Sequence, residues 1–181
     1  MKIERYTELM VAKKMGLNLF VDKKYKFGQV YMQGEKTGIR NIDKALKEAG
    51  GKPSNCRLWE ENKETTGKAQ PEYIITFDDR PDTLIVVECK NSTNRHESNR
   101  LNNPKGYAVD GVLYYAKYLK KYFNTIAIAV SGTDEENCEI TCFLWEKKKA
   151  SPVYVPDMRY EIEPPENYLD AIQDQLFVEI V

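Results

Sequence analysis

The chain has 181 residues, of which 41% are hydrophobic and 30% charged, so it is long enough to bury the core of one ordinary domain. Its net charge of −1 indicates nothing about nucleic acid, and the lack of a long apolar run or signal-peptide core excludes a membrane partner and predicts a cytoplasmic protein. Four scattered cysteines are too sparse for a disulfide framework.

The first elements are predicted from helical spacing. Apolar positions three and four apart predict a helix over residues 3–15. The same pattern predicts a second helix over residues 39–49, which ends at Gly50 and Gly51. Residues 56–60 are expected to form a short strand.

A β-hairpin is the most informative feature of the sequence. Two apolar runs, residues 72–78 and 82–90, flank a turn rich in Asp, Arg and Pro. A turn centred midway between them places Glu72 directly opposite Glu88 on one face. Lys90 lies two residues beyond Glu88, so its side chain projects from the same face. Two carboxylates and an amine are therefore expected at one end of an otherwise apolar hairpin.

Such a group of side chains predicts a metal site. Two carboxylates this close repel each other unless a cation or a proton lies between them, and oxygen ligands alone favour Mg²⁺ or Mn²⁺. An exposed Glu and Lys on a strand more often form a surface ion pair worth about 0–1 kcal/mol. Residues 84–87 are apolar on both faces, however, which indicates a strand covered on both sides. A charged side chain on such a strand is costly unless it is paired or binds a metal. Asp78 replaces Glu72 as the second acid if the turn differs.

The remaining elements predict an α/β fold. A polar loop over residues 91–103 lies beside the proposed site, followed by a helix over residues 106–122 and strands over residues 125–130 and 139–145. A strand, helix, strand succession implies a right-handed crossover to a parallel neighbour, hence a central mixed β-sheet flanked by helices. The tyrosines on the helix are expected to pack in the core.

Positive charge is concentrated around the proposed site. Residues 1–125 carry 23 Lys and Arg against 16 Asp and Glu, whereas residues 126–181 carry 4 against 12. Basic residues in or just after the polar loop are placed to contact DNA phosphates. The candidate DNA-binding residues are Arg95, His96, Arg100 and Lys105.

The last part of the chain is expected to be a linker. Residues 1–150 are predicted to form the domain that contains the proposed metal site, and residues 151–181 are rich in proline and end in a short amphipathic helix over residues 166–177. We expect this segment to lead to a further domain that the chain does not contain.

The residues of the hairpin resemble a known nuclease motif. Pro71 and Glu72, followed by Glu88-Cys89-Lys90, resemble the PD-(D/E)xK motif, with Glu where the first acid is more often Asp. The continuation NSTNRHES, YAVDGVLYYAKYL and FNTIAIAVSG resembles the N-terminal nuclease domains of restriction-modification enzymes, both the single-chain type IIG and the type I motor subunit. This resemblance covers about residues 68–133.

The resemblance implies a restriction-endonuclease-like nuclease domain and an Mg²⁺-dependent endodeoxyribonuclease that also accepts Mn²⁺. Glu72, Glu88 and the main-chain carbonyl of Cys89 would hold the metal, and Lys90 would be the catalytic amine. One position departs from the type I pattern, because Gly111 stands where a Gln often lies four residues before a helical Tyr.

The family also implies partners and leaves alternatives open. The expected partners are double-stranded DNA, a methyltransferase or motor domain or subunit, and a second copy of the chain in a homodimer. A third acid on an N-terminal helix is expected, and Glu8 and Asp43 are both candidates. The rival functions are a nuclease-like scaffold that binds DNA or protein without cutting, and a resolvase or repair nuclease for branched DNA.

Overall fold

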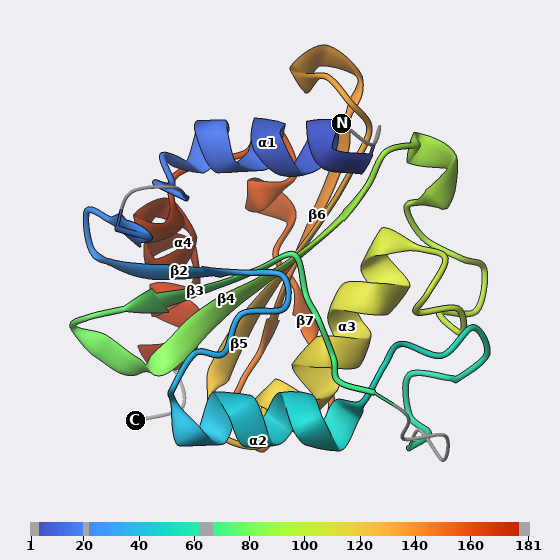
Figure 1. Cartoon of the computed structure of the whole chain (residues 1–181), viewed down its shortest axis with the longest axis horizontal. Helices are drawn as coiled ribbons and strands as arrows, with labels where there is room; N and C mark the ends of the chain where they lie inside the picture. Colours follow the sequence, from blue (N-terminus) through green and yellow to red (C-terminus); the bar gives the residue numbers. More distant parts are fainter. Residues whose placement is uncertain (1–3, 20–21, 62–66, 178–181) are drawn as a thin grey trace.

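A seven-stranded mixed sheet forms the centre of the fold, and its strands lie side by side in chain order (Figure 1). The computed structural model describes residues 4–19, 22–61 and 67–177. The strands are β1 (Lys24–Tyr25), β2 (Gly28–Met32), β3 (Tyr73–Phe77), β4 (Arg80–Lys90), β5 (Asn124–Ser131), β6 (Glu139–Trp145) and β7 (Val153–Tyr154). Only β4 and β5 are parallel, and all the other neighbours are antiparallel.

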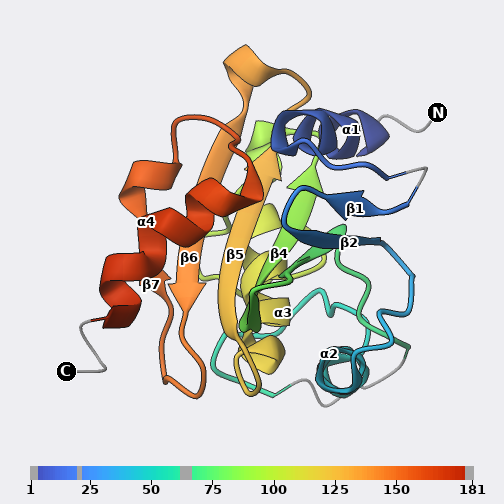
Figure 2. The ribbon, with the colours of Figure 1, turned by 90° about the vertical axis from the view of Figure 1, so that its left-hand side faces the viewer.

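Helices cover both faces of this sheet, as Figures 1 and 2 show. In the described part of the chain they are α1 (Glu4–Met15), α2 (Arg40–Ala49), α3 (Ala108–Leu119) and α4 (Pro165–Phe177). One core lies between the sheet and the pair α2 and α3, and the other lies between the sheet and the pair α1 and α4. The predicted α/β class with a mixed sheet is confirmed, and the arrangement is compatible with a restriction-endonuclease-like core.

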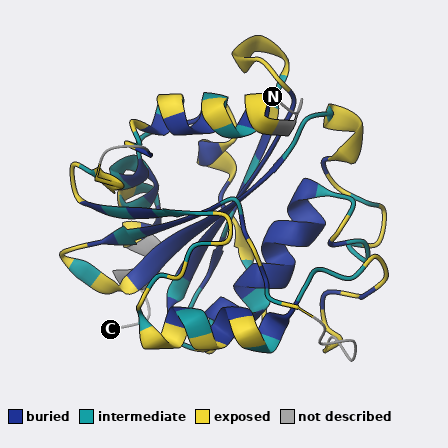
Figure 3. Ribbon diagram, in the orientation of Figure 1, coloured by how far each residue is buried: buried dark blue, intermediate teal, exposed yellow. Residues whose placement is uncertain are grey.

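Burial follows this layering (Figure 3). The two parallel strands and α3 are buried almost throughout, whereas the outer faces of α1 and α2 are exposed. The tyrosines of α3 pack in the core as expected, since Tyr114, Tyr115 and Tyr118 are all buried. No helix in the described ranges combines the length and the apolar character that crossing a membrane requires.

The predicted hairpin is present with a tighter turn. The turn is Asp78-Asp79 rather than a loop centred on Arg80, and the pairing shifts beyond Thr76. A bulge on the β4 side absorbs the difference, so that Tyr73 lies opposite Val87 in the expected register. That register, continued by one residue, sets position 72 against position 88.

Other expectations were wrong in detail. The strand expected at residues 56–60 is a turn-rich loop, in which Cys56 and Leu58 are buried and the Cys56 N–H donates to the carbonyl of Asn102 at 2.9 Å. Strands β1, β2 and β7 were not foreseen because they are short and lie toward the edges of the sheet. Residue 3, the first of the predicted N-terminal helix, lies outside the described residues.

The segment after residue 150 is part of the core, not a linker. Strand β7 pairs with β6, and α4 packs on the same face as α1. The side chains that it buries there are Val155, Met158, Ile162, Tyr168 and Ile172. The prolines that suggested a linker instead mark boundaries, since Pro156 begins a short 3₁₀ helix and Pro165 begins α4. The boundary expected at residue 150 therefore does not divide the described fold.

Two tyrosines of this segment provide a matched test. Tyr168 is fully buried and accepts a hydrogen bond from the N–H of Glu163, whereas Tyr160 is 72% exposed. Tyr168→Ala is expected to lower the free energy of unfolding by about 3–5 kcal/mol, because it leaves a large cavity. Tyr160→Ala should change it by less than about 0.5 kcal/mol. Urea unfolding followed by circular dichroism measures both changes in the free energy of unfolding. Equal and small changes would contradict the packing of this segment in the core.

Candidate functional site

The carboxyl end of β4 brings together the two acids of the hairpin. Alternation along β4 points Glu88 toward α3 and Cys89 toward the opposite core. The Glu88 side chain is 1% exposed, and the residue opposite it, Glu72, is half-buried. Asp78 instead lies exposed in the turn at the other end of the hairpin, where its N–H donates to the carbonyl of Phe27 at 2.9 Å. The structure therefore places Glu72, and not Asp78, beside Glu88.

Each of the two carboxylates has one oxygen whose hydrogen-bonding needs are unmet. Oε2 of Glu72 and Oε1 of Glu88 are buried and have no hydrogen-bond partner among the described residues. The other oxygen of Glu88, Oε2, forms an ion pair with the ammonium group of Lys52. Buried polar oxygens without hydrogen-bond partners are rare in native structures, because each one lowers the stability of the fold. Two such oxygens on facing positions are what a shared cation would satisfy.

The surroundings of Glu72 favour its protonated form. Burial, the charge of Glu88 and the charge of Glu8 together raise the pKa of Glu72 to about 9, and the ammonium group of Lys52 opposes them. The side chains of Glu72 and Glu8 also form a hydrogen bond. Without a metal ion, a proton on Glu72 reduces the repulsion among three acids.

Glu8 is the N-terminal acid that reaches this site. The first helix, α1, is fixed over the strand ends by Tyr73, whose hydroxyl donates to the Glu8 carbonyl at 2.8 Å, and by Thr7, whose hydroxyl donates to the Gly132 carbonyl at 2.7 Å. The other candidate, Asp43, lies in the first turn of α2 and accepts a hydrogen bond from the Thr37 hydroxyl at 2.8 Å. Asp43 therefore stabilises the start of a helix.

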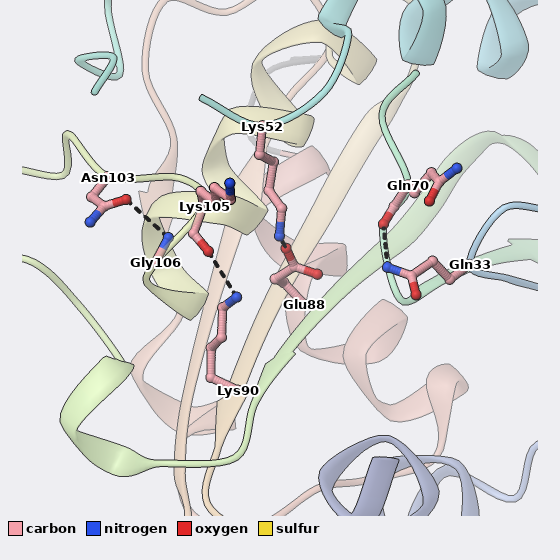
Figure 4. Close-up of polar contacts among 8 residues, drawn as sticks. All are labelled: Gln33, Lys52, Gln70, Glu88, Lys90, Asn103, Lys105 and Gly106. Carbon is pink, nitrogen blue, oxygen red and sulfur yellow. Dashed lines mark hydrogen bonds and ion pairs between the residues drawn. The ribbon is translucent and has the colours of Figure 1, made fainter. Parts of the chain in front are cut away.

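Lys90 extends from the same strand as Glu88, toward the loop that precedes α3 (Figure 4). Its side chain is half-buried, and Nζ donates to the main-chain carbonyl of Lys105 at 2.9 Å. Cys89 lies between the two, and burial raises the pKa of its thiol well above the usual range. Because this side chain points into the core on the opposite face from Glu88, the main-chain carbonyl of Cys89 is the candidate for metal binding.

The cation closest to Glu88 is a residue that sequence reasoning missed. Lys52 follows the glycines that end α2, and its side chain is 16% exposed. It lies in an irregular loop, where no periodicity indicates the direction of a side chain. The only signal in the sequence was a lysine directly after a helix stop.

The residues expected to bind DNA divide into two groups. Arg95, Arg100 and Lys105 are exposed in the loop between β4 and α3, where a phosphate could reach them. His96 is only 6% exposed, which differs from the expectation. Its Nδ1 lies 2.7 Å from the Ser131 hydroxyl and its Nε2 lies 2.6 Å from that of Thr141.

His96 therefore fixes the loop rather than contacting a ligand. Burial lowers the pKa of His96, which favours the neutral ring between its two hydroxyl partners. A second anchor is Asp110 of α3, which is 2% exposed and accepts hydrogen bonds from the N–H groups of Ser98 and Asn103. Together these contacts hold the basic loop against the sheet beside Glu88.

The carboxylate oxygens fit a magnesium ion whose coordination is completed by water and by a bound substrate. As the side chains lie, no three His, Cys, Asp or Glu residues of the described ranges form a ready cage for an ion. Mg²⁺ does not require such a cage, since it often binds through one or two carboxylates together with waters and substrate phosphates. The two unpartnered oxygens of Glu72 and Glu88 match that mode of binding.

Known proteins give no independent assignment of this site. No family model, no curated protein and no solved structure matches the chain. The geometry of Glu72 and Glu88 and the resemblance of the hairpin residues are therefore the grounds for a function.

The protonated state of Glu72 predicts a pH-dependent stability. A carboxyl group whose pKa is about 9 in the folded chain and near 4.5 when unfolded stabilises the fold at low pH. That contribution falls as the pH rises from about 4.5 to 9. In the presence of a chelator, Glu72→Gln should therefore exceed the wild type in free energy of unfolding at pH 9, by about 1–3 kcal/mol, and match it near pH 4.5.

Denaturant titrations at several pH values measure this difference. Glu161→Gln, at an exposed position, is the control and should follow the wild type throughout. A constant difference between Glu72→Gln and the wild type at all pH values would contradict the raised pKa.

Proposed function

We propose that the chain is a metal-dependent DNA endonuclease that hydrolyses phosphodiester bonds, as the nuclease domain of a restriction-modification system. The observation that carries the proposal is the pair of buried, unpartnered oxygens on Glu72 and Glu88 at the end of one hairpin. The resemblance of Glu72 and Glu88-Cys89-Lys90 to the PD-(D/E)xK motif supports the same chemistry.

The metal ligands in this proposal are the carboxylates of Glu72 and Glu88 and the main-chain carbonyl of Cys89. When bound, Mg²⁺, or Mn²⁺ in its place, polarises the scissile phosphate and lowers the pKa of a bound water. Glu72 must lose its proton for this, and the ion's positive charge favours that loss.

The remaining residues bind and orient the substrate. Lys90 holds its ammonium group near the carbonyl of Lys105, from which it can orient the attacking water and offset charge that develops on the phosphate. The exposed Arg95, Arg100 and Lys105 then contact the phosphates that flank the cleaved bond. Because the loop that carries them is fixed by His96, these contacts are positioned in advance.

The proposed partners follow from this chemistry. Double-stranded DNA is the substrate, and a homodimer is proposed because one site per chain cuts one strand at a time. A methyltransferase or motor domain or subunit would supply sequence recognition. A non-cleaving scaffold is the second candidate, and one observation favours it, namely that Lys52 already pairs with Glu88.

Nicking of supercoiled plasmid DNA tests the proposal. The wild type should nick and linearise the plasmid with Mg²⁺ or Mn²⁺ and not in a chelator. Lys90→Met and Glu88→Gln should each lower the rate by about 10²–10³-fold, because the first removes the positive charge placed beside the reacting phosphate and the second removes the charge of a metal ligand. Lys147→Met is the control, since this exposed lysine follows β6 at the opposite end of the sheet.

The same assay distinguishes the rival functions. Cleavage by Lys90→Met or Glu88→Gln at the wild-type rate would contradict the assignment of these residues. DNA binding by the wild type without cleavage, and without Mn²⁺ binding in calorimetry, would identify a scaffold. Four-way junctions and nicked duplexes included beside linear DNA would reveal a preference for branched substrates.

A further inference from the structure

We infer that Lys52 is the counter-cation of Glu88 when no metal ion is bound, and that the ion displaces the Lys52 ammonium group when it binds. This inference rests on the proposed function, because it names a residue that controls metal binding at the same site. It concerns a residue outside the motif that suggested the nuclease. Four observations carry it.

The first observation is the burial of the ion pair. The Lys52 ammonium group contacts Oε2 of Glu88, whose side chain is 1% exposed, while Lys52 itself is 16% exposed (Figure 4). An exposed pair would contribute almost nothing. In this buried position the removal of one partner leaves the other as an uncompensated charge, which strongly destabilises a fold.

The second observation is that Lys52 is held in place by more than its charge. Its Nζ lies 5.5 Å from the centroid of the Tyr115 ring, a distance at which the face of an aromatic ring attracts a cation. Tyr115 is itself 1% exposed in α3. The ammonium group is thus enclosed between a carboxylate and a buried ring, on the side of Glu88 that faces α3.

The third observation is the close approach of α3 at Gly111. A Cβ atom at this position would lie 2.9 Å from Oε2 of Glu88 and 2.8 Å from the carbonyl of Pro104. No side chain of α3 can therefore enter the space beside this oxygen at that position. Lys52 reaches this same oxygen from a different loop.

The fourth observation is that the two carboxylate oxygens of Glu88 have different contacts. Oε2 contacts Lys52, whereas Oε1 is buried and has no hydrogen-bond partner within residues 4–19, 22–61 and 67–177. A divalent ion shared by Glu88 and Glu72 would lie close to the Lys52 ammonium group and repel it. The ion and Lys52 therefore compete for one carboxylate, which lowers the metal affinity and stabilises the metal-free chain.

Lys52 remains beside the site when it is displaced. The loop that carries it is tied to the loop before α3, since the Lys105 N–H donates to the Pro53 carbonyl at 3.1 Å. Lys90 also donates to the carbonyl of Lys105, so the three lysines share one rim of the site (Figure 4). A displaced Lys52 ammonium group is then available to a substrate phosphate.

Lys52→Met tests the inference, because it removes the charge and keeps an unbranched apolar side chain. Mn²⁺ affinity measured by calorimetry should increase by about tenfold or more. A neighbouring cation weakens the binding of a proton to a carboxylate by about 1–3 orders of magnitude, and it should weaken the binding of a metal cation for the same reason. In a chelator the midpoint of thermal unfolding should fall, and saturating Mn²⁺ should raise it by more than in the wild type. Lys147→Met should match the wild type in both measurements.

The double variant Lys52→Met/Glu88→Gln covers the case in which Lys52→Met does not fold. Replacing the unpaired carboxylate should restore folding in a chelator, because it removes the charge that Lys52 neutralised. A double variant that stays unfolded would overturn the inference, since Lys52 would then act through another contact.

The outcomes separate the inference from the proposed function. Unchanged or weaker Mn²⁺ binding by Lys52→Met, with clear binding by the wild type, overturns the role of Lys52 and leaves the nuclease proposal intact. No Mn²⁺ binding by either protein overturns both.

Discussion

The carboxylates of two glutamates repel each other at the buried end of a β-hairpin, and the side chains around them reduce this repulsion. Burial withdraws water from Glu72 and Glu88, and their mutual repulsion then favours any proton or cation that can reach them. The chain uses both remedies. The raised pKa of Glu72 favours its protonated form, and Glu88 pairs with Lys52. One oxygen of each acid has no hydrogen-bond partner among the described residues, and the proposed metal ion would bind these two oxygens.

The fold determines where these groups meet. A bulge after the hairpin turn sets the register of β3 against β4, and the crossover through α3 places a parallel strand on the other side of β4. Helix α1 carries Glu8 to one side of the strand ends, and α3 closes the opposite side at Gly111, where only glycine leaves room for the Glu88 carboxylate. A site of this kind lies on rigid elements, so its acids are positioned before any ligand arrives.

The hairpin register could be predicted from the sequence because side chains alternate along a strand and two apolar runs limit the turn. The crossover to β5 followed from the order of strand and helix patterns. Lys52 could not be predicted, because a residue in an irregular loop has no periodicity and its contact with Glu88 depends on how two distant loops pack. The same reason explains His96, whose burial against Ser131 and Thr141 arises only in the folded chain, and the tail, where prolines suggested a linker while buried side chains such as Tyr168 pack onto the sheet.

If a divalent ion binds between the carboxylates of Glu72 and Glu88, diffraction from crystals soaked in Mn²⁺ and measured near the manganese absorption edge will locate it. We expect one anomalous peak within about 2.0–2.4 Å of an oxygen from each glutamate, with the Lys52 ammonium group moved away from Glu88. A saturating soak that gives no peak at these oxygens, and leaves Lys52 in contact with Glu88, would contradict it.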